Sequence, residues 1–239
     1  NYAVPMREQL VVFSQFTQFA LRGSQDGTLS PSNVWVTAAT EYETSLDVEP
    51  VSSKRSIFAT APRGSAVLLR ELYDSGSTAR PQFDAVETTA TVPTYLQGTP
   101  KRLAASSIED MVVALLEPAS GTKDTLYAYK YMINGDERVQ SAWSKYTFGG
   151  TNCDIQHIDW VDQDLYQIVR RGSETSLEKM NFEAYLKDTS SDFIIALDRR
   201  ITDATSGVSS AYNSSTDQTT FTIPYTVGTS ATMQVVTRE

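Results

Sequence analysis

A strand pattern is clearest in Gln140-Ser141-Ala142-Trp143-Ser144-Lys145-Tyr146-Thr147-Phe148, shortly after the turn-like sequence Asn134-Gly135-Asp136. Successive side chains of a strand point to opposite faces of its sheet, so Trp143 and Tyr146 lie on different faces. The period of two predicts one amphipathic strand. This strand closes the longest run of strand signals in the chain.

Similar signals recur along the chain as units of strand, turn and strand. β-Branched and aromatic residues alternate with polar ones, and Pro and Gly stand where turns need them. Blade-type hairpins are predicted near residues 8–22, 55–73, 103–148 and 154–182. Residues 74–98 are rich in Ser, Thr, Asp, Gly and Pro, so they predict one long loop.

The apolar centres of the second strands repeat at a roughly constant spacing. They are Val11, Ile57, Val112 and Tyr166, at separations of 46, 55 and 54 residues. Strand-only units at such a period are typical of a β-propeller, in which each blade is a four-stranded antiparallel meander. The predicted fold is therefore all-β with propeller-like repeated meanders. A β-sandwich with irregular loops would produce similar hairpins and remains an alternative.

The pattern changes after Phe182, where apolar residues become sparse. We predict a propeller-like β domain over residues 1–186 and the start of a second β module over residues 187–239. Within the second module, strands are expected over Phe193 to Ile201 and from Thr220 to Tyr225. A Ser/Thr-rich connection over residues 203–217 is expected between them.

Charge and cysteine content exclude several classes of function. The formal net charge is −9, from 29 acidic and 20 basic residues. That balance argues against tight non-specific binding to phosphate backbones, which depends on Lys and Arg. A single cysteine, Cys153, excludes an intrachain disulfide and a thiolate zinc cluster. No apolar run approaches the roughly 18 residues that a membrane-spanning helix needs.

The residues that could support catalysis or metal binding have simpler interpretations. His157 is the only histidine, and no Gly-x-Ser-x-Gly motif accompanies it, so we expect an ordinary surface or core histidine. Glu41 and Glu43 are one strand period apart and could form a glycosidase pair, although exposed glutamates on an edge strand give the same pattern. Asp159, Asp162 and Asp164 lack the spacing of a calcium loop and suit a solvated turn. We therefore predict no catalytic residue, cofactor or metal.

Several motifs together resemble the tail nozzle proteins (tail tubular protein B) of short-tailed bacteriophages, the podoviruses. They occur in the same order and at similar spacing over about residues 2–185, and more sparsely beyond. The motifs are Tyr2-Ala3-Val4-Pro5, Gln18-Phe19-Ala20-Leu21, Arg55-Ser56-Ile57-Phe58-Ala59, Val92-Pro93-Thr94-Tyr95-Leu96, Gln140 to Phe148 and Leu197-Asp198-Arg199-Arg200. The residues that represent them as structural positions are Pro5, Phe19, Pro93, Tyr95, Gln140, Trp143, Lys145, Phe148, Asp198 and Arg199.

The resemblance implies a structural virion protein of the phage tail, made in the host cytoplasm, and not an enzyme. Members of that family are much longer than this chain, so it would be a central piece. Six copies would ring the tail axis beside the tail adaptor protein and help to anchor tail fibres. Genomic DNA would pass through the channel without specific binding, as the acidic charge allows. In this setting Trp143 is expected to pack between blades, and Lys145 to protect a sheet edge.

Two other classes of function remain open from the residues alone. One is a carbohydrate-binding or depolymerising propeller that acts on the host surface through Glu41 and Glu43, or through the cluster Asp159 to Asp164. The other is an adhesin-like bacterial surface domain, which requires an upstream secretion signal.

Overall fold

The computed structural model describes residues 1–23, 30–75, 83–134, 137–149, 152–182 and 209–222. The chain divides into two compact units, residues 1–182 and 183–239. In the described residues every regular element is a β-strand, so the predicted all-β class is confirmed. These residues contain no helix with the length and apolar character needed to cross a membrane.

The described residues of the first unit form four antiparallel sheets, each made of consecutive strands in chain order. The first sheet is β1 (Tyr2–Met6), β2 (Gln9–Phe13), β3 (Gln18–Arg22) and β4 (Trp35–Thr40). The second is β5 (Val51–Ser53), β6 (Ser56–Arg63), β7 (Ala66–Asp74) and β8 (Phe83–Glu87). The third is β9 (Thr99–Ser106), β10 (Met111–Glu117), β11 (Thr125–Asn134) and β12 (Glu137–Thr147). The fourth is β13 (Cys153–Val161), β14 (Asp164–Arg171) and β15 (Glu174–Asn181).

The described part of the second unit is one hairpin. It pairs β16 (Ser209–Asn213) with β17 (Gln218–Thr222), and all side chains of both strands are exposed.

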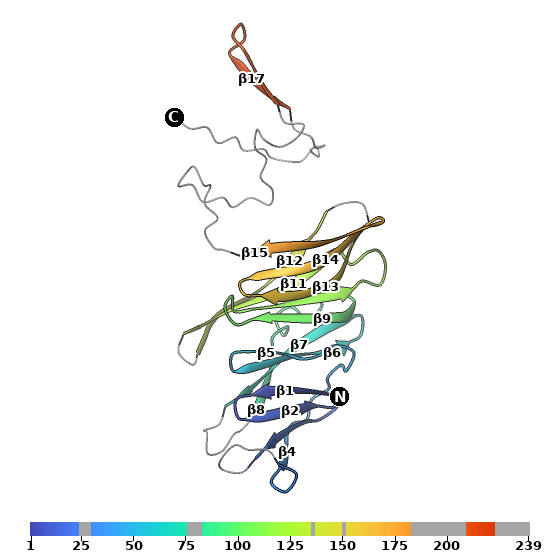
Figure 1. The fold of residues 1–239 in the computed structure, drawn as a ribbon, viewed down its shortest axis with the longest axis vertical. Helices are drawn as coiled ribbons and strands as arrows, with labels where there is room; N and C mark the ends of the chain where they lie inside the picture. The colour runs from blue at the N-terminus through green and yellow to red at the C-terminus, as the bar shows by residue number, and fades with distance from the viewer. Residues whose placement is uncertain (24–29, 76–82, 135–136, 150–151, 183–208, 223–239) are drawn as a thin grey trace. The chain divides into compact units, whose positions relative to one another are not determined.

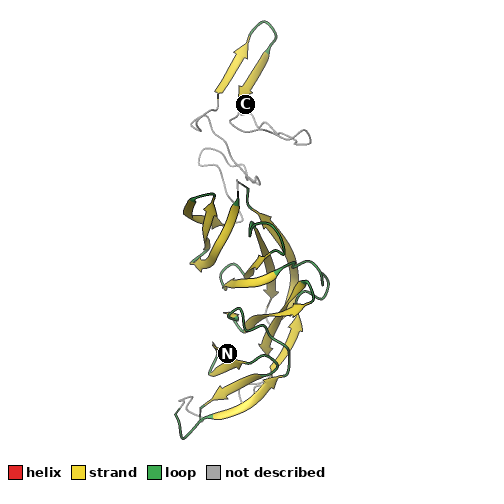
Figure 2. Ribbon diagram, turned by 90° about the vertical axis from the view of Figure 1, so that its right-hand side faces the viewer, coloured by secondary structure: helices red, strands yellow, loops and turns green. Residues whose placement is uncertain are grey.

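Sheets that are consecutive in the chain pack face to face, as the ribbons in Figures 1 and 2 show for β1 to β15. Strand β10 explains how this is possible. Val112, Ala114 and Leu116 enter the core shared with the second sheet, while Met111, Val113 and Leu115 enter the core shared with the fourth. A sheet that is buried on both faces needs apolar residues at every position, which is why β10 is a continuous apolar run.

A third core joins the first and second sheets. Val11 and Phe13 of β2 meet Ile57 and Ala59 of β6 there. Phe58, which points to the opposite face of β6, belongs to the core with the third sheet. Among the described residues no hydrophobic cluster joins the first sheet to the fourth, so these four sheets form an open series and not a closed propeller ring.

The repeat deduced from the sequence agrees with this arrangement. Val11, Ile57, Val112 and Tyr166 each lie in the second strand of a different sheet. The stretch from Gln140 to Phe148 coincides with the greater part of β12, the edge strand of the third sheet. The meander prediction is therefore confirmed strand by strand for these four positions.

The prediction of one long loop over residues 74–98 was wrong, because this segment contains strand β8. That strand is only five residues long and half-exposed, so its alternation is hidden between polar segments. β16 was missed inside the expected connection 203–217 because all five of its side chains are exposed, so it shows no apolar alternation. The expected strand from Phe193 to Ile201 and the boundary at 186 lie outside the described residues, so both stay predictions.

Candidate interaction site

Trp143 connects β12, the edge strand of the third sheet, to the second sheet. Its ring centroid lies 5.1 Å from that of Tyr129 on the neighbouring strand β11. Its Nε1–H donates a 3.0 Å hydrogen bond to the carbonyl oxygen of Thr88, just after β8. The side chain is half-buried against the core between the two sheets. Trp143 therefore lies between the second and third sheets.

A buried carboxylate forms a second connection between these sheets. Glu71 of β7 is 4% exposed and accepts hydrogen bonds from the Arg138 guanidinium and, at 2.6 Å, from the Ser56 hydroxyl. The guanidinium carbon of Arg138 also lies 5.7 Å from the ring centroid of Tyr129 and 5.4 Å from that of Tyr131. The strands β11 and β12 extend beyond the end of β10, which brings Arg138 over the second sheet.

Burial and charge have opposing effects on the pKa of Arg138. Burial disfavours the charged guanidinium, but the hydrogen bond and the charge of Glu71 outweigh it and raise the pKa of Arg138 above its usual value. The Arg138 guanidinium therefore keeps its charge at neutral pH. The pair connects residues that are 67 positions apart in the chain.

Tyr131 completes this cluster of polar side chains. Its hydroxyl lies 2.8 Å from the Ser53 hydroxyl of β5, and its ring stacks on Phe58 with centroids 5.9 Å apart. Burial raises the pKa of Tyr131 to about 12, because the phenolate would lose hydration in this core.

This shift predicts a loss of stability at high pH. Below pH 10 the phenol is protonated in both states, whereas above it the unfolded state ionises first. The free energy of unfolding should therefore fall between about pH 10 and pH 12, by about 1.4 kcal/mol per pH unit from this group. Tyr131→Phe should remove this contribution in urea unfolding curves measured across the window, and Tyr95→Phe should keep it. An unchanged slope in Tyr131→Phe would contradict the assignment.

The glutamate and arginine of this cluster were not among the residues singled out from the sequence. Glu71 stands in an apolar strand, Leu68-Leu69-Arg70-Glu71-Leu72, where a charged side chain is rarely buried without a partner. A glutamate at this position in an apolar strand was therefore the one sequence feature that indicated a buried, paired carboxylate. Its partner could not be found, because a period of two says nothing about contacts between distant strands.

The described motif residues lie in the first and third sheets and in the segments that follow β8 and β12. Pro5 is exposed on the edge strand β1, and Phe19 is half-buried on β3. Pro93 is exposed in the turn after β8, where the Tyr95 N–H donates to the Val92 carbonyl at 3.0 Å. Asp198 and Arg199 lie outside the described residues.

The other motif residues lie on or beside β12. Tyr95 meets Tyr127 of β11 edge to face at 5.7 Å, and Lys145 is the cross-strand partner of Tyr127. Gln140 is exposed, whereas Phe148 packs against the core between the third and fourth sheets. The structure thus gathers Tyr95, Trp143 and Lys145 around one face of the β11–β12 pair.

The catalytic candidates do not converge. Glu41 and Glu43 are exposed in the segment after β4, so the expectation that they share a strand face was wrong: β4 ends at Thr40. His157 is exposed on β13.

The acidic cluster is engaged with basic side chains. Asp159 pairs with Arg102 at 3.3 Å and Asp164 pairs with Lys179 at 3.0 Å. Asp162 occupies the turn between them with a φ of 55°. In the part of the chain that the structure describes, no group of three or more His, Cys, Asp or Glu side chains is placed to hold a metal ion.

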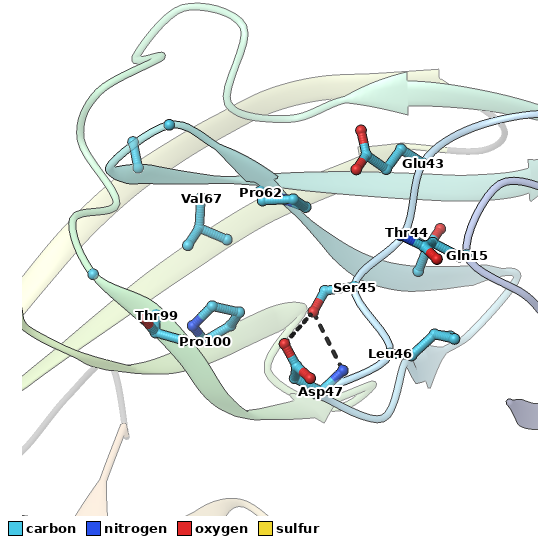
Figure 3. Close-up of a pocket in the computed structure, with 13 residues that line it drawn as sticks. Gln15, Glu43, Thr44, Ser45, Leu46, Asp47, Pro62, Val67, Thr99 and Pro100 are labelled. Carbon is cyan, nitrogen blue, oxygen red and sulfur yellow. Dashed lines mark hydrogen bonds between the residues drawn. The ribbon is translucent and has the colours of Figure 1, made fainter.

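A pocket of about 360 Å³ lies between the segment after β4 and the β6–β7 turn (Figure 3). Glu43, Ser45 and Asp47 line it, whereas Glu41 does not. The Ser45 hydroxyl donates to Asp47 Oδ2 at 3.4 Å and accepts from the Asp47 N–H at 3.3 Å. These contacts are typical of a self-capped polar turn. The polar groups of this pocket therefore stabilise the loop that carries them.

Comparison with known proteins assigns the chain to a family. A family model described as bacteriophage nozzle protein matches residues 1–239. Tail tubular protein gp12 of Escherichia phage T7 is 26% identical over 182 residues, which cover 76% of this chain. The matched part spans 22% of the length of that relative. The chain therefore belongs to the bacteriophage nozzle protein family, whose members are structural components of the virion tail.

Proposed function

We propose that the chain forms part of the wall of a phage tail nozzle, through which the genome is ejected. The family match over all 239 residues carries this proposal. The tail tubular name of the T7 relative supports it, since a tube is what a conduit requires. The whole protein would act by assembly, without a catalytic step.

The packing of the four sheets suits a wall that must resist mechanical force. Each of the two inner sheets is buried on both faces, so force applied to one sheet is passed to the next through a close-packed core. The Glu71–Arg138 pair and the hydrogen bond from Trp143 to Thr88 add directional contacts between the second and third sheets.

The negative net charge of the chain is consistent with the passage of DNA. With 29 acidic against 20 basic residues, the chain offers few uncompensated cations to phosphate groups. DNA that meets such a surface gains little from counterion release and is not retained. In the assembled tail we propose six copies around the axis, in contact with the tail adaptor protein and helping to anchor the tail fibres.

Quantitative mass spectrometry of purified virions tests this function. The full-length protein should be present at a constant ratio to the other tail proteins, near six copies per particle. Finding it in lysates of infected cells but not in purified virions would rule the proposal out.

A further inference from the structure

Lys145 differs from the other lysines that the structure describes. Five of these make ion pairs with carboxylates: Lys54 with Asp110, Lys101 with Glu117, Lys123 with Asp154, Lys130 with Glu109 and Lys179 with Asp164. No described residue forms an ion pair with Lys145, which is exposed on β12. In a chain with a net charge of −9, an unpaired lysine is an exception that needs an explanation.

Lys145 lines a second pocket, of about 330 Å³. The pocket lies where the loop 118–124, between β10 and β11, approaches β12. Its apolar wall is formed by Leu116 and Tyr127, which are 3% and 7% exposed. Gln97 and Thr122 supply polar groups.

The loop beside this pocket is held in place by its backbone. The Asp124 N–H donates to the Thr122 carbonyl at 2.9 Å, and the Asp124 carbonyl accepts from the Phe148 N–H at 2.8 Å. The Lys123 carbonyl accepts from the Ile155 N–H at 2.7 Å. A ligand would therefore meet a preformed wall and would not have to order the loop.

Of the two lysines that line the pocket, Lys145 is the one without an ion-pair partner among the described residues. The Lys123 ammonium lies 2.9 Å from Asp154 and 3.9 Å from Glu117. Asp124 also lines the pocket, and its Oδ1 accepts a hydrogen bond from the Thr125 hydroxyl at 2.8 Å. Lys145 thus remains as one available cation beside an apolar surface, whereas binding a nucleic-acid backbone needs several cations in succession.

We propose that this pocket receives an acidic side chain, Glu or Asp, from a loop of a neighbouring protein in the assembled tail. The methylene groups would lie against Tyr127 and Leu116, and the carboxylate would pair with the Lys145 ammonium. This inference rests on the proposed function, because the neighbour is another tail protein. It assigns Lys145 to an interface, whereas protection of a sheet edge would leave its ammonium in solvent.

Lysine acetylation of the full-length protein, alone and in purified tails, tests the proposal. With N-hydroxysuccinimide acetate as the probe and mass spectrometry as the readout, Lys145 should react about tenfold more slowly in tails, the factor that corresponds to about 1.4 kcal/mol. Lys130, an exposed lysine on the adjacent strand that is paired with Glu109, is the matched control and should change little.

Zero-length carbodiimide cross-linking then identifies the partner. An amide between Lys145 and an Asp or Glu of another chain is expected, and it should be lost in Lys145→Arg, whose guanidinium keeps the charge and the assembly. Equal acetylation of Lys145 in tails and in free protein would overturn the inference. Protection that disappears when tails are emptied of DNA would overturn it in favour of phosphate. Absence of the protein from tails would instead refute the proposed function.

Discussion

Replacing Arg138 by alanine should lower the free energy of unfolding by about 3 kcal/mol, the usual result when one partner of a buried ion pair is removed. The variant leaves the Glu71 carboxylate, which is 4% exposed, with only the Ser56 hydroxyl of the two partners described above. It also removes a cation from the faces of Tyr129 and Tyr131. Urea unfolding of residues 1–239 measures the change.

Arg102→Ala is the matched control for this prediction. Arg102 also pairs with a carboxylate, but that of Asp159 is 59% exposed, so its loss should cost less than about 1 kcal/mol. Equal costs for the two variants would show that the Glu71–Arg138 pair is screened by water and does not hold the second and third sheets together.

Replacing Trp143 by alanine should lower the free energy of unfolding by about 3 kcal/mol, the second large effect that we expect. This is the lower end of the range for aromatic residues in cores, because the side chain is half-buried. The variant removes the contact with Tyr129 and leaves the Thr88 carbonyl without its indole donor.

Trp143→Phe separates these two contributions. It keeps a ring against Tyr129 but lacks the N–H, so it should cost about 1 kcal/mol, the value of one hydrogen bond. A change below about 1 kcal/mol for Trp143→Ala in the same urea curves would mean that the indole is not part of the contact between sheets.

The order of the strands within each sheet could be predicted from local sequence patterns. β10 reads as a strand because Met111 to Leu116 is one apolar run, and β12 because Trp143 and Tyr146 alternate with polar residues. Each sheet pairs only consecutive strands, so local hairpin signals were enough to predict the strand order. That is why the four aligned positions, from Val11 to Tyr166, all lie in second strands.

Short strands and contacts between sheets did not follow from the sequence. β5 has three residues, too few to show a period. β1 contains Pro5, which argues against a strand except at an edge, where the structure places it. Whether a residue such as Glu71 meets Arg138 depends on how separate sheets pack, and no pattern within one strand determines that. The spacing of Glu41 and Glu43 misled for another reason, because β4 ends at Thr40, three residues before Glu43.

Cryo-electron microscopy of intact tails, at a resolution that separates β-strands, tests the proposed function most directly. We expect a six-fold ring around the ejection channel, in which each copy contributes sheets β1–β4, β5–β8, β9–β12 and β13–β15 packed face to face in that order. A tail wall whose density cannot accommodate these four sheets, or which lacks this protein, would contradict that proposal.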